Sequence, residues 1–381
     1  MPMRDLGRTI SRFVKWEQTE VLLMIVGVKI ALFALSIIVA LLMAEAQGEE
    51  TVMQFLLIIW DRWDSAWYHG LADTGYAATG YAANRIVFLP LYPILIRIVK
   101  EITGSFISAS MSVSNIFSIV GLYLFYRLTR LELGRQVAWY ALVAFLLFPS
   151  AYFFNAAYTE GVFLCLAVGA FYCARKGWWW GAGVLGSLAA FTKILGLFLF
   201  PALLLEFFLQ RKDNHQKRFQ VVWLSLIPGS FLVYLLYNYQ LFGDWLAFMN
   251  VVGGNWQKSF SWPWVGLAER WRVMGSFPFS KSGVMTGLAE WLAGMGLLVG
   301  LVVSFFRLRT SYFVYLLGIS FIILSTTKLE STPRYVLTAF PIFMLLGKVG
   351  KYRWLAVPLT LLSVGCMALF MGYFNQSWGA Y

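Results

Sequence analysis

Long apolar runs separated by short polar segments make up most of the chain. A helix needs about 20 apolar residues to cross the hydrocarbon core of a bilayer, and runs near this length recur from end to end. The candidates are residues 21–43, 106–126, 137–154, 160–174, 219–241, 286–306, 311–326, 334–348 and 354–374. This pattern predicts an all-α polytopic membrane protein, with one transmembrane domain over residues 1–381.

The run at residues 180–209 decides the number of crossings. It is too long for one ordinary span, and Thr192 and Lys193 interrupt it. If it crosses twice, the basic residues of the short loops all face the side of the N-terminal segment, residues 1–20. Basic loops normally face the cytoplasm. We therefore expect about eleven helices, a cytoplasmic N-terminus, an outside C-terminus and Lys193 at an external turn.

The composition excludes several classes of protein. With 60% hydrophobic and 13% charged residues, the chain is neither a soluble enzyme nor a disordered protein. Its net charge of +12 comes from Lys and Arg that recur between apolar runs, so it predicts no nucleic-acid partner. The sequence has no Walker loop, no HExxH motif and no Gly-rich dinucleotide motif, and its three cysteines lack metal-ligand spacing.

Two long segments, residues 44–105 and 242–285, fall on the external side in this topology. Both are rich in Trp and Tyr, and disordered segments are poor in aromatic residues. Long loops in compact proteins are commonly functional. We expect the first external loop to be partly helical and to carry the chemistry.

The first loop contains a carboxylate among aromatic residues. If residues 60–69 are helical, Trp60, Asp64, Trp67 and Tyr68 share one face. A carboxylate in such a setting is suited to act as a general base on a hydroxyl group. The alternative is an interfacial amphipathic helix whose acids face water. Further candidates in this segment are Asp61, Trp63 and His69. We expect no cofactor; the alternative is a divalent metal held by Asp61 and Asp64.

A proline-containing stretch follows in the same loop. Pro90 and Pro93 restrict the backbone, so we expect a turn that leads into an interfacial helix at residues 94–100. Tyr92, between the two prolines, is a supporting candidate.

Two cations begin or interrupt helices at the external side of the predicted topology. A lysine inside an apolar run, such as Lys193, costs about 2.5 to 3.5 kcal/mol unless it has an anionic partner or reaches the interface. Arg334 opens another helix. Together they could form a phosphate site, whereas the alternative for each is a cation that only reaches the interface. Supporting candidates are Tyr158, Glu160, Thr192 and Tyr335, although Glu160 could simply complement a helix dipole.

These residues, in this order, resemble the PIG-V family of integral-membrane mannosyltransferases, which add the second mannose in glycosylphosphatidylinositol assembly. The matching pieces run across most of the chain. They are residues 63–68, residues 88–93, Tyr158-Thr159-Glu160, Thr192-Lys193 with Gly196, and Pro333-Arg334-Tyr335.

The resemblance implies a glycosyltransferase of the GT-C superfamily with an acid on its first external loop. Such an enzyme moves a sugar, which is mannose in this family, from a polyprenyl-phosphate donor to a lipid or glycan acceptor, with inversion. Asp64 would be the base, and Lys193 and Arg334 would hold the donor phosphate. Family members more often carry Arg at the position of Lys193, and a lysine lacks the planar fork of donors.

Two other classes fit the sequence less well. A transporter or flippase for lipid-linked sugars would place charges near the bilayer midplane, in two related halves, and neither feature is evident. A noncatalytic lipid-binding subunit would need the cations but not Asp64. The short loops favour a bacterial plasma membrane, with the site facing outside; in a eukaryote the endoplasmic reticulum is the expected membrane.

Overall fold

The computed structural model describes residues 3–44, 59–211, 215–276 and 283–375. These residues are largely helical, and their one β-type pairing is an isolated bridge between Phe260 and Thr326. The all-α prediction is therefore confirmed. Residues 45–58 and 277–282 of the two long loops lie outside the described residues.

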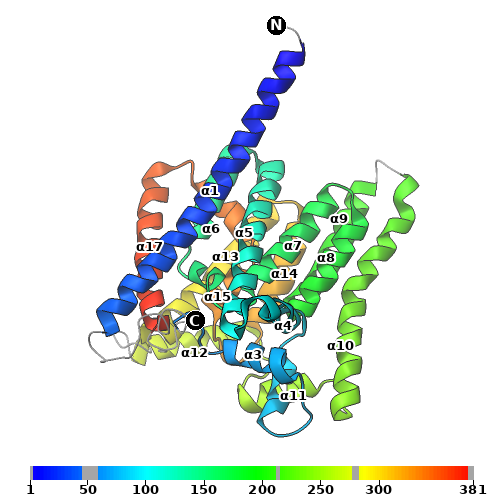
Figure 1. The fold of residues 1–381 in the computed structure, drawn as a ribbon, viewed down its shortest axis with the longest axis vertical. Helices are drawn as coiled ribbons and strands as arrows, with labels where there is room; N and C mark the ends of the chain where they lie inside the picture. The colour runs from blue at the N-terminus through cyan, green and yellow to red at the C-terminus, as the bar shows by residue number, and fades with distance from the viewer. Residues whose placement is uncertain (1–2, 45–58, 212–214, 277–282, 376–381) are drawn as a thin grey trace.

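Each apolar run predicted to cross the membrane has a helical counterpart. Successive segments alternate in direction, and the N-terminal part of α1 extends beyond the bundle (Figure 1). The segments are α1 (Met3–Ala44), α5 (Phe106–Leu133), α6 (Arg135–Leu146), α7 (Glu160–Arg175), α8 (Trp179–Thr192), α9 (Leu199–Arg211), α10 (Leu226–Phe242), α13 (Glu290–Arg307), α14 (Thr310–Leu324), α16 (Pro341–Val349) and α17 (Arg353–Asn375).

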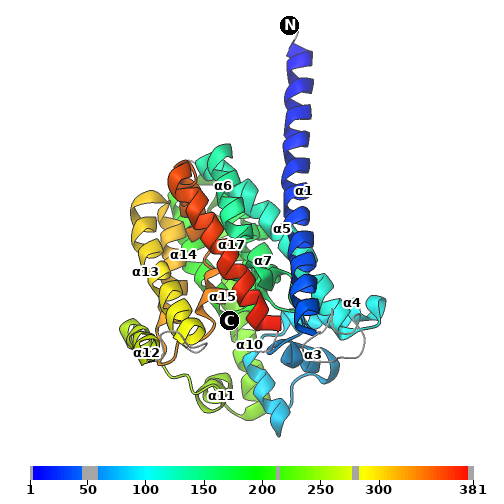
Figure 2. The same cartoon turned by 90° about the vertical axis from the view of Figure 1, so that its left-hand side faces the viewer.

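The long connections gather at one end of this bundle. Figure 2 shows four short helices of these connections at the lower end: α3 (Ser65–Thr74), α4 (Leu91–Thr103), α11 (Ala247–Asn255) and α12 (Pro263–Ser276). We call this end the loop end, and the opposite end, where the connections are short, the turn end. The remaining elements are α15 (Thr332–Val336), η1 (Tyr81–Val87), η2 (Ala151–Phe154), η3 (Ile194–Phe198), η4 (His215–Ser225) and η5 (Gly283–Ala289).

Five helical stretches in the described residues are long and apolar enough to cross a membrane alone. They are Trp16–Ile38, Phe106–Leu133, Phe219–Phe242, Gly283–Arg307 and Arg353–Phe374. The other segments are shorter, and α7 shows why: every residue from Glu160 to Phe171 is buried. A helix surrounded by protein need not match the lipid thickness by itself. The chain is a polytopic all-α membrane protein.

The run at residues 180–209 divides into two helices, as the charge pattern predicted. Helix α8 ends at Thr192, and Lys193 is extended, with φ −145° and ψ 140°. The chain then turns back through η3 into α9. Gly196 makes this reversal possible, because a Cβ there would lie 2.4 Å from the backbone nitrogen of Ala190. Lys193 therefore lies at the loop end.

Two predictions for the first loop are wrong in detail. The helix expected over residues 60–69 begins at Ser65, because Trp63 has a left-handed backbone with φ 57°. Trp60 therefore does not share a helix face with Tyr68; it packs on Phe33 of α1, with ring centroids 5.1 Å apart. The helix expected at residues 94–100 begins earlier, at Leu91, since a proline in the first turn removes no intrahelical hydrogen bond.

Two predicted spans are interrupted at the loop end. In the span 137–154, α6 ends at Leu146 and the chain continues into η2. In the span 334–348, the short α15 ends at Val336 and α16 starts at Pro341. A proline cannot donate the backbone hydrogen bond that a continuous helix would need there. Irregular backbone at this depth is tolerated only where protein surrounds it, and Phe154, Leu337 and Phe340 are all buried.

We expect cysteines placed at the two ends to be accessible from opposite sides of the membrane. Tyr81 of η1 is 77% exposed at the loop end, and Trp178, between α7 and α8 at the turn end, is 55% exposed. In a background with Cys165, Cys173 and Cys366 replaced by alanine, an impermeant maleimide should label Tyr81→Cys in intact cells. Trp178→Cys should react only after permeabilisation. Labelling of both in intact cells would refute the crossing pattern.

Candidate functional site

A cavity of about 440 Å³ opens at the loop end. Its wall combines segments that are far apart in the sequence: the start of α3, the reversal after α8, α11 and the start of α15. Most of the candidate residues from the sequence line it, namely Trp63, Asp64, Tyr68, Tyr158, Thr192, Lys193, Arg334 and Tyr335. The structure thus brings together the acid and both cations.

Asp64 lies where α3 begins. Its backbone oxygen accepts hydrogen bonds from the amides of Trp67 (3.1 Å) and Tyr68 (3.2 Å), whereas its side chain does not cap the helix. The carboxylate instead accepts a hydrogen bond of 2.8 Å from Nη1 of Arg334. The aromatic setting that we expected around Asp64 therefore also contains a cation.

Arg334 is held in the cavity wall by its own short helix. The carboxylate of Glu290, on α13, accepts hydrogen bonds from the backbone amides of Ser331 (2.7 Å) and Thr332 (2.9 Å). The hydroxyl of Ser150 donates to the backbone oxygen of Pro333 at 2.6 Å. These contacts fix the start of α15, so the direction of Arg334 is set by buried groups and not by a mobile loop.

The guanidinium of Arg334 is surrounded by aromatic rings. Its Cζ atom lies 5.0 Å from the ring centre of Tyr158 and 5.4 Å from that of Tyr335. Its Nε atom is 3.6 Å from Oε1 of Glu160 and has no hydrogen-bond partner among the described residues. A buried donor without a partner is costly in a folded protein, and a bound anion would satisfy it.

Lys193 completes a chain of four charges. Its Nζ atom donates to Oε1 of Glu160 at 2.7 Å and lies 5.3 Å from the ring centre of Tyr335. Glu160, which is fully buried, therefore stands between Lys193 and Arg334. The order is Lys193, Glu160, Arg334, Asp64, with two positive and two negative formal charges. The sequence predicted the convergence of the cations, but not that each has a carboxylate partner.

Two aromatic candidates form the layer behind the cavity wall. Trp67 stacks on Tyr81 with centroids 4.7 Å apart. Tyr92 packs edge-on against Tyr68 at 5.0 Å, and its hydroxyl donates to the backbone oxygen of Ser110.

Burial, together with the charge of Asp64, keeps the pKa of Tyr68 well above its ordinary value of 10. The Tyr68 hydroxyl therefore stays protonated.

Asp61 and His69 do not line the cavity. The two side chains face each other, with Nδ1 of His69 3.6 Å from Oδ1 of Asp61, and Nε2 of His69 lies 3.0 Å from the hydroxyl of Ser110. Burial lowers the pKa of His69 below 6.5, although Asp61 opposes this shift. Asp61 and Asp64 thus have different partners. Within the described residues, no group of three or more His, Cys, Asp or Glu side chains could hold a metal ion.

The cavity also contains residues that the sequence analysis did not select. Lys258 and Glu330 both line it, and their charged atoms are 3.4 Å apart. They come from segments joined by the bridge between Phe260 and Thr326. No local pattern marks either residue, because the contact that brings them together is long-range in the sequence.

Comparison with known proteins gives only distant similarities. No family model and no curated protein matches the chain. Among solved structures, ArnT from Cupriavidus metallidurans bound to undecaprenyl phosphate is 16% identical, with 86% of this chain and 76% of that chain covered and a TM-score of 0.46. The apo oligosaccharyltransferase of Archaeoglobus fulgidus is 12% identical, with 94% and 56% covered and a TM-score of 0.47. At these scores the likenesses carry no functional argument for this chain.

We expect Glu290→Ala to destabilise the protein, because it leaves the partly buried amide of Ser331 and the buried amide of Thr332 without their acceptor. The free energy of unfolding should fall by about 2 kcal/mol or more, measured as a lower thermal midpoint in detergent. Glu290→Gln keeps an acceptor oxygen and should lose less. If Glu290→Ala unfolds at the wild-type temperature, Glu290 does not hold α15 in place.

Proposed function

We propose that the chain is a GT-C glycosyltransferase that uses a polyprenyl-phosphate sugar. It would transfer the sugar to a hydroxyl group of a lipid or glycan acceptor, with inversion at the anomeric carbon. The observation that carries this proposal is that Lys193, Arg334 and Asp64, linked through the buried Glu160, line one cavity at an end of a membrane-spanning bundle. A lipid-linked donor would reach such a cavity from the bilayer while its sugar enters from the aqueous side.

The reaction needs a base and positive charge, and the cavity supplies both. The acceptor oxygen would attack the anomeric carbon as its proton passes to the carboxylate of Asp64. The bond between that carbon and the phosphate oxygen would break, and the lipid phosphate would leave with the electron pair. Positive groups already in position stabilise such developing charge. Arg334 and Lys193 would contact the departing phosphate.

The pairing of Asp64 with Arg334 suggests how the donor would prepare the base. The four-charge chain has no net formal charge, so a phosphate that binds the unpartnered Nε of Arg334 would add negative charge beside Asp64 and compete with it for the guanidinium. Guanidinium has five donors and binds phosphate in the same fork geometry as a carboxylate. Donor binding would therefore draw Arg334 toward the phosphate and release Asp64 for the acceptor hydroxyl.

The identity of the sugar and the membrane are finer parts of the proposal. Mannose follows from the ordered motifs that resemble the PIG-V family, including Trp63-Asp64-Ser65-Ala66-Trp67-Tyr68 and Pro333-Arg334-Tyr335. The charge bias favours a site on the outer side of a bacterial plasma membrane. We assign no cofactor, and the assays below include a chelator to test for a divalent metal.

Asp64→Asn should fold but lose transfer activity, because an amide cannot accept the acceptor's proton. General base catalysis contributes about 100- to 10,000-fold, so kcat should fall by this factor. The measurement is transfer of labelled mannose from polyprenyl-phosphate mannose by purified protein, with a panel of lipid and glycan acceptors, with and without chelator.

Asp73→Asn is the matched control for this substitution. Asp73 lies on the same helix, is exposed and does not line the cavity, so its variant should retain wild-type rates. Wild-type turnover by Asp64→Asn would remove Asp64 from the mechanism. Donor binding without transfer in wild type and variant alike, with every acceptor, would instead favour a transporter or a noncatalytic lipid-binding subunit.

Lys193→Ala and Arg334→Ala should impair use of the donor more than use of the acceptor. A hydrogen bond to a charged group contributes about 1.5 to 3 kcal/mol, which corresponds to roughly 10- to 100-fold in kcat/KM for the donor. Arg334→Lys should restore only part of the loss, because it lacks the fork. Arg272→Ala removes an exposed cation of α12 at the same end that does not line the cavity and should have little effect. A change in the acceptor KM alone would contradict the phosphate assignment.

A further inference from the structure

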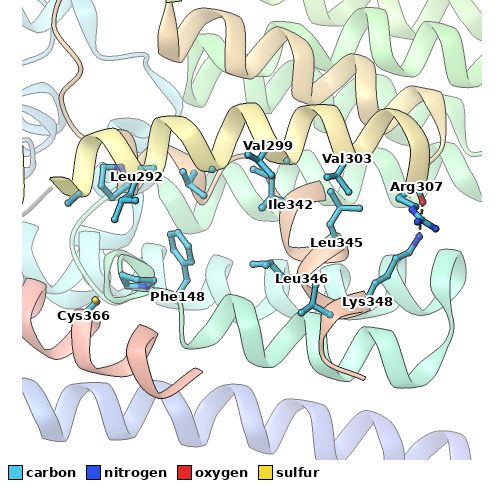
Figure 3. Close-up of a pocket in the computed structure, with 18 of the residues that line it drawn as sticks. Phe148, Leu292, Val299, Val303, Arg307, Ile342, Leu345, Leu346, Lys348 and Cys366 are labelled. Carbon is cyan, nitrogen blue, oxygen red and sulfur yellow. Dashed lines mark hydrogen bonds between the residues drawn. The ribbon is translucent and has the colours of Figure 1, made fainter. Parts of the chain in front are cut away.

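A second and larger cavity lies on another side of the bundle. It is a groove of about 690 Å³ between α13, α16 and α17. Figure 3 shows Leu292, Val299 and Val303 of α13 along one wall, with Ile342, Leu345 and Leu346 of α16 facing them. The sugar-transfer proposal uses none of these side chains, and the groove shares no lining residue with the site cavity.

The groove is apolar along its length and basic at the turn end. Arg307, Lys348 and Lys351 line that end, and Nζ of Lys348 donates to the backbone oxygen of Arg307 at 2.7 Å (Figure 3). Within the described residues, no ion pair to a carboxylate includes any of these three side chains. Other cations of the turn end differ: Arg175 and Arg309 both pair with the buried Glu206, at 2.9 and 3.0 Å. No carboxylate of the described residues therefore compensates the charge at the groove.

The dimensions fit a single hydrocarbon chain. Leu292 and Arg307 are fifteen residues apart on α13, which corresponds to about 22 Å along a helix. This exceeds the depth of one leaflet, about 15 Å, or half the hydrocarbon thickness. Gly296 lines the groove, and a Cβ at this position would meet no atom within 4 Å. The space beside α13 is thus open.

We propose that this groove binds an anionic glycerophospholipid from the leaflet at the turn end. Its phosphate would lie against Arg307, Lys348 and Lys351, and one acyl chain would run along α13 toward Leu292. Basic pockets between transmembrane helices recognise anionic headgroups in this way. The same lipid would pack against Pro333 and Val336 of α15, which also line the groove. This proposal does not depend on the sugar-transfer reaction.

The test is lipid retention by purified, delipidated protein. Native mass spectrometry would compare phosphatidylglycerol and phosphatidylcholine that carry identical acyl chains. We expect wild type to retain phosphatidylglycerol in about tenfold preference. Lys348→Gln/Lys351→Gln should lose most of this preference, whereas Gly296→Leu, which fills the groove, should retain neither lipid.

Matched variants separate the groove from the rest of the surface. Gly229→Leu on α10 also places its side chain in open space, and it lies outside the groove. Lys176→Gln/Arg353→Gln removes two cations that do not line the groove. Both controls should bind lipid as wild type does. Thermal midpoints would show that each variant is folded. If Gly296→Leu does not fold, the comparison of Lys348→Gln/Lys351→Gln with Lys176→Gln/Arg353→Gln tests the proposal.

Four results would overturn the proposal. Equal retention of the two lipids by wild type would remove the headgroup site, as would an unchanged preference in Lys348→Gln/Lys351→Gln. Unchanged lipid binding by folded Gly296→Leu would place the lipid elsewhere. Displacement of phosphatidylglycerol by a small excess of undecaprenyl phosphate, itself lost in Gly296→Leu, would instead assign the groove to an isoprenoid chain.

Discussion

The contact between Asp64 and Arg334 joins residues 270 positions apart in the sequence, and the loop end is organised around it. Removing charges from water is costly unless each has a partner. Arg334 and Glu160 are buried, so neither could lie here without the other and without Asp64 and Lys193. This requirement forces α3, α7, the reversal after α8 and α15 to meet at one point. The rings of Phe153, Tyr158 and Tyr335 pack around Arg334 at the same place.

Interrupted helices put these charges where they can meet. Lys193 follows the last residue of α8, Glu160 is the first residue of α7 and Asp64 immediately precedes α3. Arg334 belongs to a five-residue helix held by Glu290. In a continuous helix across residues 180–209 or 334–348, Lys193 or Arg334 would project from the side of the helix. The course of that helix would then fix its depth in the membrane. The breaks let each side chain enter the cavity from a chain end or reversal, with its backbone supported by buried acceptors and donors.

Much of this arrangement could be predicted from the sequence, and the omissions have a common cause. Apolar run length predicted the helical segments, and the interruption at Lys193, read with the charge bias, predicted the reversal after α8. Local spacing could not show that Trp63 takes a left-handed conformation. This conformation delays the start of the helix to Ser65, so Trp60 is not on the predicted helix face. Local spacing also could not predict that Lys193 pairs with Glu160. Nor could it predict that Asp61 and His69 lie outside the cavity wall, or that Lys258 belongs to it. Each of those outcomes depends on contacts between distant segments, whereas periodicity reports only neighbours along one helix.

The site cavity and the groove differ in how their cations are paired, and the difference bears on what each can bind. At the loop end every cation of the four-charge chain has a carboxylate partner, so an arriving anion would compete with these partners, Asp64 among them. At the groove Arg307, Lys348 and Lys351 contact no described carboxylate, so an anion would simply add to them. The first arrangement suits a substrate that must trigger a reaction and then leave. The second suits a lipid that stays bound.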